Sequence, residues 1–176
     1  MAEVSEDATI LLATSWQALN RAKNDGKKTE VCNCMVVIVF AAFFIEANLN
    51  HIVEAMNQTS VMNRFLNNSY AGLQDKLGWF YNQYVARQRA NTKKQMYDNN
   101  IVKKLRRKFP GFTKIYKFRN NISHGVVSRK ITNLSDAQSL RNLAKQIVDE
   151  LFEIAQKTGF EIPRKVHYVD AITPVN

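Results

Sequence analysis

The sequence of 176 residues has few of the residues that break helices or crosslink a chain. Three prolines and six glycines are too few for a protein built from many short strands. The only two cysteines, Cys32 and Cys34, are two positions apart. On a helix this spacing directs their side chains about 160° apart, which excludes a shared metal or an easy disulfide. We therefore expect reduced thiols and a cytoplasmic protein.

The sequence also has little that directs it to a membrane. Residues 1–7 are acidic rather than basic, so we expect no signal peptide. The most apolar run, VCNCMVVIVFAAFFI at 31–45, is shorter than the roughly 20 residues of a spanning helix and is interrupted by Asn33. We interpret this run as a central core helix and expect no membrane partner; a membrane segment is the alternative.

Acidic residues are almost missing from one segment. Between Arg87 and Lys130 there are 14 lysines and arginines and a single acid, Asp98, whereas the rest of the chain has 11 basic and 14 acidic residues. A basic segment on a slightly acidic body predicts a polyanionic partner such as RNA, with a solvated basic surface as the alternative. The candidate RNA contacts are Lys103, Lys104, Arg106, Arg107, Lys114, Lys117 and Arg129.

Apolar residues recur throughout at helical spacing. The pattern predicts an all-α bundle of about five to seven helices in a single domain, 1–176, with a core at about 5–158 and a C-terminal tail at 159–176. Thr29 and a capping box at Ser135–Gln138 are predicted to begin helices, and Gly159 to end one. The predicted helices cover 8–23, 29–57, 58–68, 70–87, 101–109, a stretch from 112 or 113 through the following motif, and 135 to about 158, with a loop at 91–100.

The segment FRNNISHG, at 118–125, combines groups suited to chemistry. His124 titrates near neutrality, as a general acid or base must, and Arg119 keeps its charge and suits a phosphate. On a helix Asn120 and His124 share a face, whereas Arg119 and His124 are about 140° apart. One interpretation is phosphodiester chemistry in a groove between helices. The other is a surface arginine with a hydrogen-bonded histidine.

The motif resembles the signature of the HEPN superfamily, in which arginine, commonly followed by asparagine, precedes histidine by a few residues. Arg119, Asn120 and His124 match it, and AFFIEANLN at 42–50 resembles the second helix of that family. The resemblance covers most of 5–158. It implies a HEPN-like bundle of four to five helices, commonly homodimeric, with both motifs in a shared basic cleft. Many members are metal-independent ribonucleases in toxin–antitoxin or antiviral-defence systems, so an antitoxin or defence protein is a candidate partner.

The resemblance also assigns roles. His124 moves the proton of the ribose 2′-OH or of the leaving 5′-oxygen, Arg119 stabilises the transition-state charge, and Asn120 orients the histidine or the phosphate. No cofactor or metal is implied. Supporting candidates are Ser123, Glu46 and Asn50; for the last two, ordinary buried polar groups are the alternative.

Two further hypotheses stay open: a catalytically inactive HEPN module that binds nucleotides, nucleic acid or a partner, and an unrelated helical nucleic-acid-binding protein. Val126 stands where some two-gene toxins have a tyrosine that a partner enzyme modifies, which argues against that form of regulation. His51 and Glu54 have helical metal-ligand spacing, but we find no third ligand for them.

Overall fold

The computed structural model describes residues 6–56, 72–81, 103, 106–123, 133–157, 159–160 and 162. Every regular element within these residues is helical, which confirms the all-α prediction. Residues 106–108 are also helical, just before the turn at Pro110 and Gly111. The helices with assigned bounds are α1 (Glu6–Asn24), α2 (Lys27–Ala55), α4 (Leu73–Tyr81), α6 (Phe112–Ser123) and α7 (Leu134–Lys157).

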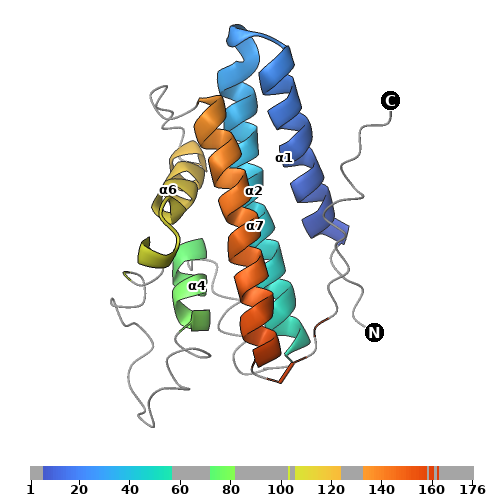
Figure 1. Ribbon diagram of the computed structural model, residues 1–176, viewed down its shortest axis with the longest axis vertical. Helices are drawn as coiled ribbons and strands as arrows, with labels where there is room; N and C mark the ends of the chain where they lie inside the picture. Colours follow the sequence, from blue (N-terminus) through green and yellow to red (C-terminus); the bar gives the residue numbers. More distant parts are fainter. Residues whose placement is uncertain are drawn as a thin grey trace.

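The longest helix, α2, is the centre of the bundle. Figure 1 shows α2 and α7 side by side along the length of the molecule, with α1 on one side and α6 and α4 on the other. The other four helices all contact α2, so its position fixes where the remaining elements lie. Its core-facing side chains recur at helical spacing and are fully buried: Val37, Ile38, Ala41, Phe44, Ile45, Leu49 and Ile52.

The opposite side of α2 is also apolar but only partly covered. Val36, Val39, Phe40 and Phe43 are half-buried, and Cys32 at the beginning of this side is exposed. The stretch Thr29–Ala55 is long and apolar enough to cross a bilayer, although only 39% of its most apolar window is buried in the bundle. The apolar helix continues ten residues beyond the run at 31–45, so its length does not by itself exclude a spanning segment, and the expected absence of a membrane partner stays a prediction. Core helices of soluble proteins have the same length and composition.

A buried arginine lies between α1 and α7. Arg141 is 6% exposed, and its Nε donates a hydrogen bond to Ser15 Oγ at 3.1 Å. Ser15 in turn donates to the carbonyl of Leu12 at 2.7 Å. Burial lowers the pKa of Arg141, because the charged form loses its hydration. Within the described residues Arg141 makes no ion pair, so Ser15 is its polar partner in the core.

Two of the predicted helix starts are wrong. α2 begins after Gly26, and the Thr29 hydroxyl instead lies near the carbonyls of Asp25 and Gly26, at 3.5 and 3.4 Å. The cap of α7 is Asn133, whose Oδ1 accepts a hydrogen bond from the Asp136 amide at 2.8 Å. α2 begins two residues before its predicted start, at Lys27, and α7 begins one residue before its own, at Leu134. In both cases another residue that is able to cap a helix, Gly26 or Asn133, lies just before the predicted start.

The end of α7 agrees with its prediction. Gly159 has φ +89°, and its amide bonds the carbonyl of Gln156 while the amide of Phe160 bonds that of Ala155. This pair of bonds is a Schellman motif. Phe160 and Ile162, which belong to the predicted tail, pack against the core. The predicted helix at 58–68, the loop at 91–100 and the tail from 163 onwards lie outside the described residues.

Candidate functional site

The helix α6 carries the first half of the motif and is held by its apolar face. Ile115 and Phe118 are buried, and Ile122 packs partly against the core. These side chains fix the rotation of α6, since exposing them costs roughly 1.5–3 kcal/mol each. That rotation turns Arg119 towards α2, with 27% of its side chain exposed.

Arg119 belongs to a cluster of three charges from three helices. Its Nη2 lies 3.6 Å from Oε2 of Glu46 on α2, and the other oxygen of Glu46 lies 2.6 Å from Nζ of Lys76 on α4. The side chains of Glu46 and Lys76 are 18% and 10% exposed. Two cations thus share one carboxylate in a partly desolvated place, where charge interactions are stronger than at the surface. The three groups together carry a net charge of +1.

Two further contacts orient the guanidinium. Its central carbon lies 5.8 Å from the ring centroid of Phe43, within cation–π range. Nη1 donates a hydrogen bond to Oδ1 of Asn120 at 3.3 Å. Phe43 and Glu46 are three residues apart and therefore neighbours on α2. One side of α2 thus holds both the apolar and the ionic contact of Arg119.

The other predicted site residues are placed only in part. Asn50, one turn after Glu46, is half-buried, and its Oδ1 has no hydrogen-bond partner within the described part of the chain. Ser123 is the last residue of α6, but its side chain is not among those that the structure describes. His124 lies beyond the described residues. The structure therefore brings together Arg119, Asn120 and Glu46, and the catalytic pairing of Arg119 with His124 stays a prediction.

The sequence interpretation did not identify Lys76 or Phe43 as site residues. The signal for Lys76 was nonetheless present. In α4, Leu73, Leu77 and Phe80 form the buried face, and Lys76 falls among them. A lysine on the apolar face of a helix is buried only when it has a partner. Glu46, an acid within the apolar α2, is its complement.

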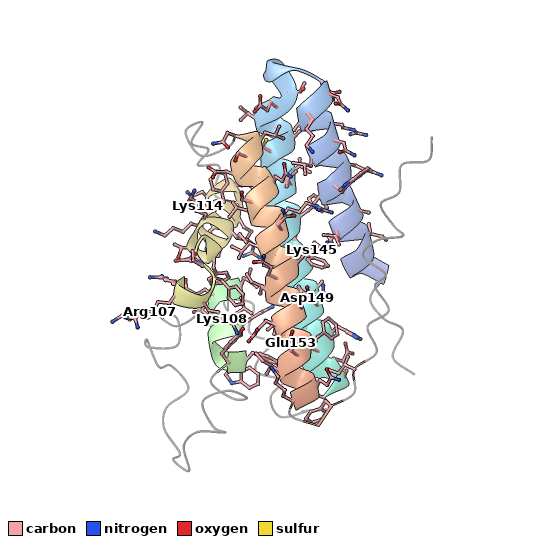
Figure 2. The ribbon with its side chains drawn as sticks, in the orientation of Figure 1. Arg107, Lys108, Lys114, Lys145, Asp149 and Glu153 are labelled. Atoms are coloured by element: carbon pink, nitrogen blue, oxygen red, sulfur yellow. The ribbon has the colours of Figure 1, made fainter. Side chains whose placement is uncertain are left out.

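The predicted RNA contacts lie on the outer side of the molecule around α6. Lys103, Arg106, Arg107 and Lys117 are exposed, and Figure 2 shows Arg107 projecting outwards at the beginning of this region. Lys114 is exposed as well, but it pairs with Asp136 of α7 at 3.2 Å. Lys104 and Arg129 lie outside the described residues.

Metal ligands do not gather in the described part of the chain: no group of three or more His, Cys, Asp or Glu residues there is close enough to hold an ion. His51 is buried whereas Glu54 is exposed, and the described residues place no third ligand beside them.

Comparison of the chain with models of known families, with curated protein sequences and with solved structures found no match. Among the described residues of the motif, Arg119 is held by an acid, an amide and an aromatic ring. These contacts fix the orientation of the guanidinium while 27% of the side chain stays exposed.

Proposed function

We propose that the protein is a HEPN-type, metal-independent endoribonuclease that acts as a toxin or antiviral-defence effector. The observation that carries the proposal is the placement of Arg119, which is fixed by Glu46, Phe43 and Asn120 yet keeps 27% of its side chain exposed. The cluster has an excess positive charge, which a phosphodiester neutralises. The exposed cations of the surrounding segment add long-range attraction for RNA.

The proposed reaction is attack of a ribose 2′-oxygen on the neighbouring phosphorus. The 2′-O–P bond forms, the bond to the 5′-oxygen breaks, and the products are a 2′,3′-cyclic phosphate and a 5′-hydroxyl. His124 carries the proton taken from the 2′-OH or given to the 5′-oxygen. Arg119 stabilises the charge that develops on the phosphoryl oxygens. DNA lacks the nucleophile and is not a substrate.

A homodimer is part of the proposal, with the two motifs close to a shared cleft. The half-buried apolar side of α2 supports it, because Val36, Val39 and Phe43 recur at the spacing of a helix–helix seam. Phe43 also contacts Arg119. An isologous contact along this side of α2 would therefore bring the arginines of both subunits to the rim of the interface.

An inactive binding module is the second candidate, and Glu46 favours it. A carboxylate 3.6 Å from Arg119 neutralises part of the charge that a transition state needs. In such a module the net charge of the cluster would bind a nucleotide phosphate without cleaving RNA. The two candidates differ in turnover rather than in affinity.

The deciding experiment incubates the purified protein with single-stranded RNA and with DNA of the same sequence, both in EDTA. The proposal predicts RNA fragments with 2′,3′-cyclic phosphate ends and intact DNA. Intact RNA that is nevertheless bound would support the inactive module. Cleavage that requires a divalent cation would contradict the proposed mechanism.

A further inference from the structure

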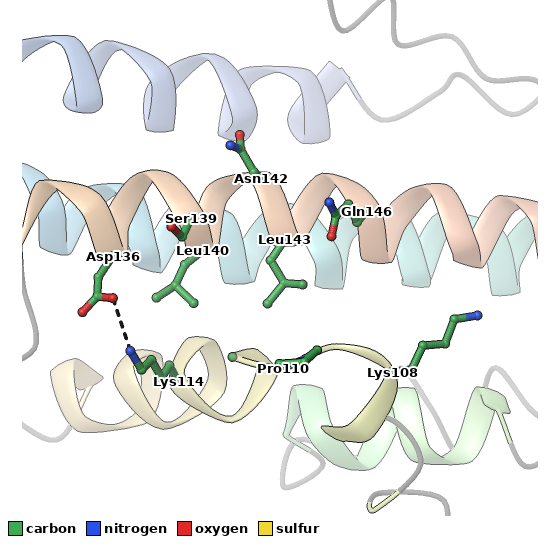
Figure 3. Close-up of a pocket in the computed structure, with 10 residues that line it drawn as sticks. Lys108, Pro110, Lys114, Asp136, Ser139, Leu140, Asn142, Leu143 and Gln146 are labelled. Carbon is green, nitrogen blue, oxygen red and sulfur yellow. Dashed lines mark hydrogen bonds and ion pairs between the residues drawn. The ribbon is translucent and has the colours of Figure 1, made fainter.

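A groove of about 500 Å³ lies between α7 and the turn that precedes α6. Figure 3 shows Leu140 and Leu143 of α7 pointing towards Pro110 of this turn. Both leucines are largely buried, so they form an apolar floor. Gly111 allows the close approach, because a Cβ there would lie 3.3 Å from Cδ2 of Leu143.

The two ends of the groove are marked by lysines that cross from the turn region to α7. Lys114 pairs with Asp136 at one end, and Lys108 pairs with Glu150 at the other. The lysine side chains remain about half exposed, at 53% and 49%. Exposed ion pairs of this kind contribute only about 0–1 kcal/mol, so a phosphate can replace either carboxylate at small cost.

Between the two ion pairs, the polar lining that α7 gives the groove is uncharged. It includes Ser139 and Gln146, and both are exposed. A hydroxyl and an amide provide donors and acceptors that match the edge of a nucleobase. The apolar floor suits the face of a planar ring, and the lysines suit its phosphates.

We propose that this groove binds one nucleotide of a single-stranded RNA. The base lies over Leu140 and Leu143 with its edge towards Ser139 and Gln146, and the flanking phosphates contact Lys108 and Lys114. The inference deepens the proposed ribonuclease function by adding a substrate subsite outside the motif. Arg119 follows Lys114 by five residues, about 7.5 Å along the axis of α6, on another side of the helix.

Charge favours RNA over a peptide as the occupant. The exposed Arg106 and Arg107 lie directly before Lys108, and the exposed Lys117 follows Lys114. An RNA strand that enters the groove therefore meets cations on both sides of it. An apolar peptide would gain nothing from them.

The test measures binding of a fluorescent six-nucleotide RNA with 2′-O-methyl riboses, which cannot be cleaved by 2′-oxygen attack. The double variant Ser139→Ala/Gln146→Ala should bind it about tenfold more weakly, because two hydrogen bonds to the base are lost. An RNA of the same length without bases should bind both proteins equally. The control Gln138→Ala/Gln156→Ala changes two exposed positions of α7 outside the groove and should leave the affinity unchanged.

The salt dependence of binding tests the role of Lys108 and Lys114 separately. Lys108→Gln/Lys114→Gln should reduce the slope of log K against log salt by about 1.4, since each phosphate contact on a single strand contributes about 0.7. Unchanged affinity in the Ser139/Gln146 variant, or an unchanged salt slope here, overturns the proposal. Failure of the ribonuclease function is seen separately, as intact unmodified RNA, because these assays measure binding alone.

Discussion

Arg119 and Glu46 form an ion pair at 3.6 Å between α6 and α2. The pair joins the helix that carries the motif to the central helix of the bundle, and Lys76 ties the same carboxylate to α4. A side chain proposed to meet substrate is therefore also part of the packing of three helices. Substitutions in this cluster must be tested for stability and for activity separately.

Glu46→Gln should destabilise the protein by about 2 kcal/mol, because it leaves the mostly buried ammonium of Lys76 without its carboxylate. Urea unfolding followed by circular dichroism measures this loss. The control is Glu153→Gln, which removes the exposed Lys157–Glu153 pair and should cost about 0.5 kcal/mol or less. Equal costs for the two variants would mean that burial does not strengthen the Glu46 cluster.

Ser15→Ala should cost about 1–3 kcal/mol, because Arg141 loses its hydrogen-bond partner in the core. Arg141→Met should cost less or even stabilise, since it removes the buried charge together with its need for a partner. Thermal and urea unfolding rank the two variants. A larger loss for Arg141→Met than for Ser15→Ala would contradict this account of the α1–α7 contact.

Substitutions at two glycines distinguish the cost of backbone strain from the cost of a steric clash. Gly111→Ala and Gly159→Ala both place a Cβ at positive φ, +98° and +89°, a conformation that costs an ordinary residue about 1–2 kcal/mol. Only at Gly111 does the new Cβ also crowd Leu143, which adds about 1 kcal/mol or more; at Gly159 nothing lies within 4 Å. We expect Gly111→Ala to be the less stable variant in urea. Similar stabilities would show that the turn before α6 does not approach α7 as closely as described.

The two cysteines should differ in reactivity. Cys32 is exposed, whereas Cys34 is fully buried, and burial, followed by the charge of Glu30, raises the pKa of the Cys34 thiol. A raised pKa leaves less of the reactive thiolate at any given pH. A thiol reagent should therefore modify one cysteine in the native protein and both in denaturant, and Cys32→Ser should abolish the native reaction. Rapid native labelling of Cys34 would contradict the packing of α2.

The strongest helices could be predicted from the sequence because tertiary packing and local pattern agree in them. The apolar run at 31–45, continued by Leu49, Ile52 and Val53, identified α2, and the repeat from Leu140 to Ile154 identified α7. Helix starts were less predictable. Near Thr29 and Ser135 several neighbouring residues are able to cap, and the choice between them depends on contacts made after folding.

The site residues within the motif could be predicted from the sequence. A site residue that is identified only by a contact between helices distant in the sequence could not. Arg119 and Asn120 follow from the motif, and Glu46 was singled out on α2 as a supporting residue. Lys76 was missed because its partner is 30 positions away in the sequence. A pairwise contact of this kind requires the arrangement of α2 and α4, which helical periodicity alone does not specify.

The most direct test of the central claim is the rate of RNA cleavage in EDTA by the wild type, His124→Ala and Arg119→Ala. The account predicts that each substitution lowers the rate by about 10²–10⁴, since each removes a group that acts in the transition state. Arg21→Ala, at an exposed position of α1 outside the basic segment, and His167→Ala are matched controls and should keep most of the activity. Wild-type cleavage by His124→Ala, in a preparation free of contaminating nuclease, would contradict the catalytic assignment of the motif.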